Sequence, residues 1–213
     1  MTSDMIPRDV YDRLKAREPD RVWKMVDALE KCLERCRTSP APEGWSWTGS
    51  HRTPPLAHYR REPEKGRCRV CWKQEGMTKR STWHPECVTA YHFFVSPDTY
   101  LLAAIQDFIC PGCGEAIGIA RRMRTGEWDM RLYGGPMGVM PEADHVKPLY
   151  RVRREFRAME WYDLLWFWTP ANLQALCREC HARKCGQEAR ERANFKASGG
   201  YPTSLLDLME AAE

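Results

Sequence analysis

Four cysteines form two Cys-x-x-Cys pairs, CPGC at residues 110–113 and CREC at residues 177–180. Each short turn directs two sulfur atoms at one point, so the two pairs together supply the four thiolates of a tetrahedral zinc site. The pairs are 63 residues apart, and the ion would therefore join a whole domain. Four core cysteines or a redox-active pair are the alternatives. The spacing favours a structural zinc bound by Cys110, Cys113, Cys177 and Cys180. A structural zinc contributes roughly 10 kcal/mol of apparent folding free energy in small domains.

A second set of candidate ligands lies upstream, in the segment CRVCWKQEGMTKRSTWHPEC at residues 68–87. The order Cys-x2-Cys, twelve residues, His-x2-Cys matches the spacing of three thiolates and one imidazole around zinc. The predicted ligands of this second zinc are Cys68, Cys71, His84 and Cys87. His92 competes for the nitrogen position, and a packed His84 without metal is the alternative. Cys32 and Cys36 lie four apart on a predicted helix without a nearby histidine, which favours small core residues, and Cys185 is left unpaired.

The segment EADHVKPL at residues 142–149 places an aspartate beside a histidine at the end of a predicted strand. A neutral imidazole with a pKa near 6.5 can take a proton from water at neutral pH, whereas a carboxylate can bind a metal ion. Adjacent residues of a strand point to opposite faces, so Asp144 and His145 are suited to separate tasks. The pair alone does not decide between a reactive centre and two ordinary polar residues.

Together with WTPANLQALCRECHARK at residues 168–184, this stretch resembles the HNH endonucleases, a branch of the ββα-metal (His-Me finger) nucleases. The resemblance is to the subset of this family in which Cys-x-x-Cys pairs bind a structural zinc. The family pattern is Asp-His-hydrophobic-x-Pro, then Asn-Leu-x-x-Leu-Cys-x-x-Cys-His-x-x-Lys. It is matched by Asp144, His145, Val146, Pro148, Asn172, Leu173, Leu176, Cys177, Cys180, His181 and Lys184. The resemblance covers roughly residues 67–195. Residues 82–114 are similar to the segment before this core in some phage proteins and in HNH domains attached to Swi/Snf-type translocases.

The resemblance implies a metal-dependent endonuclease that hydrolyses DNA phosphodiester bonds, by nicking or by double-strand cleavage. It implies that His145 takes a proton from the attacking water and that Asp144 and His181 bind one Mg²⁺ or Mn²⁺ ion. It also implies that Asn172 holds the His145 ring in place, through its side-chain amide or through the local backbone. Because His181 follows Cys180 directly, the zinc would also fix a ligand of the catalytic ion. A catalytically silent, zinc-dependent DNA-binding or interaction module is the alternative, and a redox protein is a third.

One segment departs from the family pattern. Residues 150–170 form a predicted helical insertion, where family members commonly have Gly-Gly and a shorter path to the asparagine. The insertion includes the aromatic run WYDLLWFW at residues 161–168. Such a run could act as a wedge in a DNA groove, but core packing is the favoured interpretation. The insertion removes no catalytic group from the motif.

The charge of the chain permits nucleic-acid binding without requiring it, since 33 Lys and Arg against 29 Asp and Glu give a net charge of +4. Phosphate contacts would position DNA without reading its sequence. The candidates follow the Asp-His pair or lie on the last predicted helix: Lys147, Arg151, Arg153, Arg154, Arg178, Arg183, Lys184, Arg190 and Arg192. For any one of these residues, a solvated helix face is the alternative.

The resemblance, together with the predicted elements, implies a fold of class α+β, in which a small zinc-stabilised ββα core carries additional helices and an upstream zinc-binding module. We expect an N-terminal helical segment at residues 1–37 and a linker or irregular arm at 38–66. The zinc-binding module should occupy residues 67–100 and the nuclease domain residues 101–196, followed by a tail with a short helix at 197–213. Hydrophobic periodicity predicts one or two helices at residues 8–37, a helix from Asp98 into Cys110, a helical stretch at 150–168 and a basic helix at 181–195. Strands are predicted within residues 126–135 and 140–146, around a Gly-Gly-Pro turn.

The sequence also sets expectations for location and partners. No apolar run reaches the roughly 18 residues that span a bilayer, and the N-terminus lacks the apolar core of a signal peptide. We therefore expect a soluble protein of the cytoplasm of a bacterium or a phage-infected cell, with DNA as its partner and no membrane contact. The resemblance does not extend to residues 1–66, which could carry either the specificity or a contact with a phage or host protein.

Overall fold

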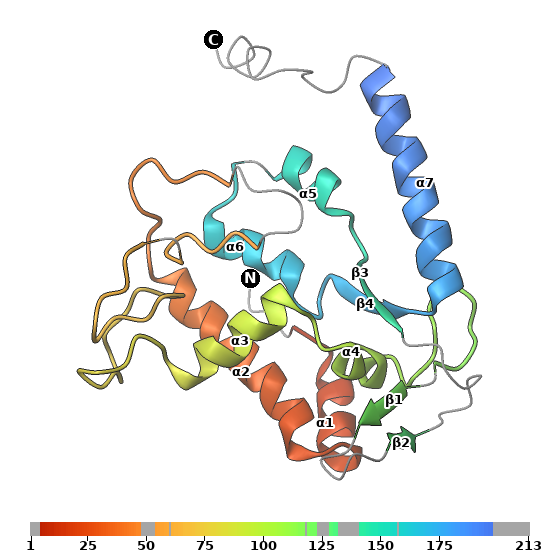
Figure 1. The fold of residues 1–213 in the computed structure, drawn as a ribbon, viewed down its shortest axis with the longest axis horizontal. Coiled ribbons are helices and arrows are strands. Elements are labelled where there is room, and N and C mark those ends of the chain that lie inside the picture. Colours follow the sequence, from red (N-terminus) through yellow and green to blue (C-terminus); the bar gives the residue numbers. More distant parts are fainter. Residues whose placement is uncertain are drawn as a thin grey trace.

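The structure is a computed structural model that describes residues 5–47, 54–59, 61–117, 119–122, 128–131, 141–156 and 158–197. These residues form seven α-helices, one 3-10 helix and two separate two-stranded sheets (Figure 1). The chain is therefore a mixed α/β protein, as expected. A single hydrophobic core draws residues from the N-terminal helices, the upstream cysteine segment and the C-terminal part. None of the helices in the described ranges is both long enough and apolar enough to cross a membrane.

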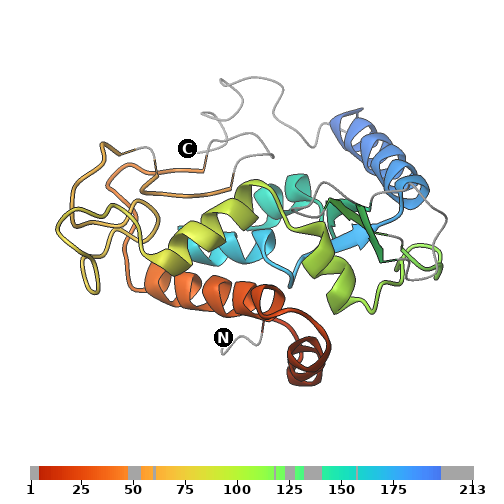
Figure 2. The same cartoon turned by 60° about the horizontal axis from the view of Figure 1, so that its bottom comes forward.

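The N-terminal segment forms two helices, α1 (Arg8–Arg17) and α2 (Asp20–Arg37), which confirms the prediction for residues 8–37. The break falls at Pro19, because proline lacks an N–H group and disfavours a helical conformation in the residue before it. One stripe of α2 is buried, namely Val22, Val26, Leu29, Cys32 and Cys36. This stripe faces α3 (Pro85–Val95), a helix that was not predicted, and the two helices lie side by side in Figures 1 and 2.

Helix α4 (Thr99–Ile105) begins where it was predicted to begin but ends early. The side chain of Asp98 caps it by accepting a hydrogen bond of 3.0 Å from the backbone N–H of Leu101. The prediction that the helix continues into Cys110 was wrong. Asp107 and Phe108 have φ values of 52° and 59°, in the left-handed region, so the chain leaves the helix and turns toward Cys110.

The four strands pair in two antiparallel sheets. Strand β1 (Ile119–Arg122) pairs with β2 (Trp128–Arg131), and β3 (Glu142–His145) pairs with β4 (Leu173–Leu176). Strands within 126–135 and 140–146 were predicted, and both exist, but they lie in different sheets and do not pair with each other. The Gly-Gly-Pro turn between them lies outside the described residues.

The segment between β3 and β4 is helical, as predicted, but it is interrupted. It contains α5 (Leu149–Glu155), α6 (Trp161–Leu165) and the 3-10 helix η1 (Trp166–Trp168). The aromatic run contributes to the core, since its buried members are Trp161, Leu164, Leu165 and Trp168. Helix α7 (Arg178–Ala197) follows β4 and projects from the body of the protein, which confirms the predicted basic helix (Figure 1). The short helix expected within the tail lies outside the described residues.

The predicted linker contains no helix or strand in its described part, yet it packs against the core. Residues 54–58 are buried, and the indole Nε1 of Trp161 donates a hydrogen bond of 2.9 Å to the carbonyl of Ser39. The His58 ring stacks on Trp72 and meets the edge of Trp161, with centroid distances of 5.7 and 5.2 Å. The segment thus joins the helical insertion to the N-terminal half.

His58 is a buried imidazole that makes stability depend on pH. Its Nε2 lies 3.2 Å from the hydroxyl of Ser39, whereas its Nδ1 has no hydrogen-bond partner among the described residues. Burial, with a smaller contribution from the positive charge of Arg61, lowers the pKa of His58 to about 4. Folding therefore favours the neutral ring.

Acidification is expected to destabilise the protein through His58. The pKa of His58 in the folded state lies below its value of about 6.5 in the unfolded chain, so the contribution of the neutral ring to stability is complete above pH 6.5 and is lost as the pH falls toward 4. The resulting loss in the free energy of unfolding is about 2 kcal/mol at pH 5. In His58→Gln, the free energy of unfolding should therefore fall less between pH 7 and pH 5. Urea titrations of the zinc-loaded proteins measure this difference. His92→Gln, at an exposed histidine, should behave like the wild type, and identical pH profiles for all three proteins would contradict the assignment.

Candidate functional site

The two Cys-x-x-Cys pairs of the C-terminal part meet at one point. The sulfur atoms of Cys110, Cys113, Cys177 and Cys180 all lie within 4.8 Å of one another, as the spacing predicted, and the group could hold zinc. The first pair follows α4, and the second links the end of β4 to the first turn of α7. Burial opposes ionisation of Cys110, but backbone N–H groups, first that of Cys177, point at its sulfur, and the pKa of the thiol falls to about 7.

Gly112 provides the space in which the two pairs meet. A Cβ atom there would lie 2.8 Å from Cβ and 2.9 Å from Sγ of Cys180. Since a zinc ion bound to this group would fix that sulfur, Gly112→Ala is expected to destabilise the zinc-loaded protein by about 1–3 kcal/mol and to weaken zinc retention. Thermal unfolding and titration with a chelator measure both effects.

The matched control is Gly186→Ala in α7, where an added Cβ would meet nothing within 4 Å. This variant should retain zinc like the wild type and gain up to about 1 kcal/mol, because alanine favours a helix more than glycine does. Equal zinc retention by the two variants would contradict the steric argument.

The upstream ligands also come together. One atom each of Cys68, Cys71, His84 and Cys87 lies within 4.8 Å of the others, all four residues are buried, and the group could hold zinc. Nδ1 of His84 is 3.3 Å from the sulfur of Cys71, and its Nε2 is 2.8 Å from the carbonyl oxygen of Glu75. That carbonyl accepts a hydrogen bond from the N–H group at Nε2 of His84, which leaves the unprotonated Nδ1 as the ligand atom. His92 is exposed, so the histidine of the group is His84.

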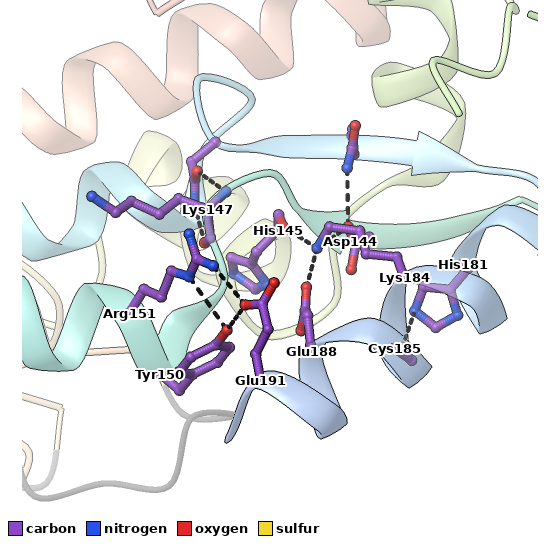
Figure 3. Close-up of polar contacts among 12 residues, drawn as sticks. Asp144, His145, Lys147, Tyr150, Arg151, His181, Lys184, Cys185, Glu188 and Glu191 are labelled. Atoms are coloured by element: carbon purple, nitrogen blue, oxygen red, sulfur yellow. Dashed lines mark hydrogen bonds and ion pairs between the residues drawn. The ribbon is translucent and has the colours of Figure 1, made fainter. Parts of the chain in front are cut away.

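The Asp-His pair lies on β3, beside the first turns of α7 (Figure 3). Asp144 is buried, and its Oδ2 is 3.0 Å from Nε2 of Gln174, the residue opposite it on β4. The same oxygen forms an ion pair of 2.8 Å with Nζ of Lys184 from α7. Asp144 is therefore fixed from both the neighbouring strand and the helix.

The ammonium group of Lys184 joins β3 to α7. It lies 2.8 Å from Oδ2 of Asp144 and 2.8 Å from the backbone carbonyl of His145, and it also pairs with Glu188 (Figure 3). Burial disfavours the charged form, but the two carboxylates outweigh burial and raise the pKa of Lys184. Lys184 was predicted to contact phosphate; in this structure its charge is directed at the acidic groups of the site.

His145 carries an unsatisfied nitrogen. Its Nε2 is buried without a hydrogen-bond partner among the described residues, and its ring meets Trp168 edge-on at 5.7 Å. Burial is the main cause that lowers the pKa of His145 to about 4; Lys184 also lowers it, against the opposing effect of Asp144. The ring is therefore neutral at pH 7 and can accept a proton.

Asn172 holds the chain directly after His145. Its Oδ1 accepts a hydrogen bond of 2.8 Å from the N–H of Lys147, and its Nδ2 donates to the carbonyls of Lys147 and Phe167 at 3.2 Å. Its own carbonyl accepts from the N–H of Val146 at 2.7 Å. These contacts fix the backbone that directly follows His145.

His181 contacts Glu142, a residue that sequence reasoning missed. Nδ1 of His181 is 2.6 Å from Oε2 of Glu142, and its Nε2 is 3.6 Å from Sγ of Cys185. The signal for Glu142 was present in the sequence, because residues 142 and 144 of a strand share one face. Among the described residues, only the two cysteine groups bring three or more potential metal ligands within 4.8 Å of one another, so Glu142, Asp144 and His181 do not form such a group.

Half of the other predicted phosphate contacts are paired with acidic or aromatic side chains. Lys147 pairs with Glu155, Arg151 lies 2.5 Å from Glu191, and Arg192 lies 3.8 Å from Glu188. Arg154 pairs with Glu155 at 3.4 Å and lies over the ring of Phe195. Among the predicted phosphate contacts, four exposed arginines have no ion pair with a described residue: Arg153, Arg178, Arg183 and Arg190.

A pocket of about 390 Å³ opens between the first Cys-x-x-Cys turn and α7. Its polar lining comes from Gln174, Arg183, Lys184 and Gln187, and two of these residues, Gln174 and Lys184, also contact Asp144. Comparisons with protein-family models, curated proteins and solved structures found no match for this chain. The function of the site therefore rests on its own residues and their arrangement.

Proposed function

We propose that this protein is a metal-dependent endonuclease of the HNH type that hydrolyses phosphodiester bonds in DNA. The observation that carries the proposal is the unit formed by β3, β4 and α7. This unit gathers the four motif residues Asp144, His145, Asn172 and His181, although they are spread over 38 positions of the sequence. A hairpin followed by a helix, with the histidine at the end of its first strand, is the core that the motif implies.

His145 is the proposed general base. A base near neutral pH must be unprotonated before substrate arrives, and the lowered pKa of His145 meets this condition. The unprotonated nitrogen of the ring would take the proton of the attacking water. Asn172 acts as a positioning residue, since it fixes the backbone that follows the histidine.

Asp144 and His181 would hold one divalent ion, with Mg²⁺ or Mn²⁺ as the expected ions. When bound, such an ion supplies charge neutralisation at the phosphate and stabilises the departing oxygen. Two observations support this assignment: Asp144 presents a buried carboxylate, and a carboxylate oxygen of Glu142 lies 2.6 Å from Nδ1 of His181. Lys184 neutralises one oxygen of Asp144 and contributes a fixed positive charge next to the site.

The two cysteine groups are proposed as structural zinc sites. The group at Cys110 fixes the junction of β4 and α7, and His181 directly follows one of its ligands. The upstream group ties α3 to the irregular segment before it. Zinc would thereby place the catalytic side chains without taking part in the chemistry.

DNA is the proposed partner. Helix α7 is largely exposed along its length and carries exposed arginines, and the pocket beside Asp144 is lined by amide and cationic groups suited to phosphate and sugar oxygens. Such contacts predict binding without sequence preference and a strong dependence on salt.

A plasmid assay tests the proposal. Supercoiled plasmid incubated with the purified protein should convert to open-circular or linear DNA with Mg²⁺ or Mn²⁺ and stay supercoiled with EDTA. If the protein retards DNA in a gel but leaves it uncut with every metal, the silent binding module is the better description. A protein that neither binds nor cuts DNA would refute both.

A further inference from the structure

The segment that carries the first ligands of the upstream group holds an excess of positive charge. Residues 59–83 contain eight Lys and Arg against three Glu, a net charge of +5, while the whole chain carries +4. A Zn²⁺ ion bound by three thiolates and a neutral His84 would add a charge of −1, which leaves the segment basic. Its described part lies at one end of the molecule and α7 at the other (Figures 1 and 2). A basic surface there attracts a polyanion at a place separate from the proposed active site.

Two arginines of this segment lie over aromatic rings. Cζ of Arg61 is 4.8 Å from the centre of the Trp72 ring. Cζ of Arg69 is 4.7 Å from the centre of the Tyr59 ring, and it also lies 5.6 Å from that of Trp83. A ring beneath a guanidinium holds it in place through a cation–π contact and leaves N–H groups available to an anion.

The hydrogen-bonding capacity of these two guanidinium groups is largely unused. Arg61 is exposed, and neither it nor Arg69 forms an ion pair with a described residue. Arg69 donates a hydrogen bond of 3.2 Å from Nη2 to the carbonyl of Tyr59, and its buried Nε has no partner among the described residues. A guanidinium presents its N–H groups in a planar fork that matches a phosphate group. The terminal nitrogens of both arginines are therefore suited to bind phosphate.

The basic side chains beside Asp144 are employed differently. Lys184 pairs with Asp144 and Glu188, and Arg151 lies 2.5 Å from Glu191. A phosphate group that approached these side chains would have to displace a carboxylate. The two arginines over aromatic rings have no such competitor, so they bind phosphate without breaking an ion pair.

The aromatic rings of this surface already have stacking partners. Tyr59 stacks on Tyr91 with ring centroids 4.7 Å apart, and Trp72 stacks on His58 at 5.7 Å. A guanidinium also lies over each of these two rings. Rings that are occupied in this way present no free face to an unpaired base, so the contact is made by guanidinium groups with the phosphate backbone. Regularly spaced phosphates are what duplex DNA presents.

We propose that Arg61 and Arg69 form the centre of a second DNA-binding surface, which holds the backbone of duplex DNA at the end of the molecule opposite α7. The choice of DNA among polyanions rests on the proposed function. This surface adds affinity without reading sequence, because it contacts phosphate alone. The upstream metal-binding group supports it, since Arg69 directly follows the ligand Cys68 in the chain.

Binding of a short labelled duplex to the full, zinc-loaded chain tests this inference. Fluorescence anisotropy is measured without added Mg²⁺ or Mn²⁺, so that the duplex stays intact. Arg61→Gln/Arg69→Gln should weaken binding by roughly 10- to 100-fold at about 0.1 M salt and lower the slope of log K against log[salt] by about 2, since each phosphate contact contributes about 0.9. The matched control, Arg8→Gln/Arg17→Gln, removes the same charge from two exposed arginines of α1 that pair with aspartates, and it should bind like the wild type. Equal affinities and salt slopes in the two variants would overturn the inference.

Protection of arginine by DNA gives a second measurement that needs only the wild-type chain, so it holds even if the double variant does not fold. Modification by a dicarbonyl reagent, located by mass spectrometry, should be slower at Arg61 with duplex DNA than without it. Unchanged modification of Arg61 would overturn the inference, and so would protection by single-stranded DNA alone.

The two proposals fail separately. Neither measurement depends on cleavage, so a protein that binds DNA through these arginines but leaves plasmid uncut refutes the nuclease and keeps the surface. Cleavage of plasmid together with unchanged binding by the double variant refutes the surface and keeps the nuclease.

Discussion

His145→Ala is expected to slow plasmid nicking by about 10²–10⁴-fold, the usual contribution of a general base. The ring is half-buried, and its lowered pKa of about 4 keeps it uncharged at pH 7, as a general base requires. Because alanine removes a half-buried ring beside Trp168, the folded state must be verified by circular dichroism and zinc content. The rate of loss of supercoiled plasmid with saturating Mn²⁺ is the measurement.

The matched control is His92→Ala, at an exposed histidine on α3. This variant should nick plasmid at the wild-type rate. If a folded, zinc-loaded His145→Ala protein cuts as fast as His92→Ala, the assignment of the base is wrong. Loss of activity in both variants would instead indicate a general loss of structure.

Cys180→Ala is expected to have the second large effect, on both stability and activity. Cys180 supplies a thiolate to the group that joins β4 to α7, and structural zinc in small domains is worth roughly 10 kcal/mol of apparent folding free energy. Without this ligand, the first turns of α7, which carry His181 and Lys184, lose their attachment to β3. We expect loss of one zinc per chain, a lower melting temperature and no measurable nicking.

Cys185→Ala separates this effect from the loss of a cysteine as such. It removes a thiol from the same helix five positions later, outside both metal-binding groups. Zinc content and thermal stability should stay at wild-type values. A Cys180→Ala protein that keeps its zinc and its melting temperature would show that the four-cysteine group does not stabilise the fold.

The metal-binding groups could be predicted because their information is local. A Cys-x-x-Cys turn holds two sulfurs together in any fold, and two such turns need only one ion to meet. The same reasoning could not place Cys32 and Cys36, since their i, i+4 spacing shows only that they share a helix face. What that face contacts is decided by the packing of α2 on α3. Helix α3 was not predicted, because the residues at its start, His84 and Pro85, were interpreted only as part of a metal-binding segment.

The motif identified the site residues, but not their contacts. Alternation along β3 separates Asp144 from His145, as expected, yet the pairing of β3 with β4 depends on a partner beyond a long insertion. Lys184 illustrates the same limit. Its position on a basic helix suggests a contact with solvent or phosphate, whereas its long side chain reaches back to Asp144 and Glu188. Side-chain direction on an exposed helix is set by the charges that the fold brings near it.

The position of the four-cysteine group also bears on chain entropy. Its two pairs enclose a loop of 63 residues that contains β1 to β4 together with α5 and α6. A cross-link that closes a loop of this length lowers the entropy of the unfolded chain by an amount worth about 4 kcal/mol at 25 °C. Zinc would therefore act as a reversible cross-link, which restricts the unfolded chain while the ion is bound and ceases to do so when the ion is withdrawn.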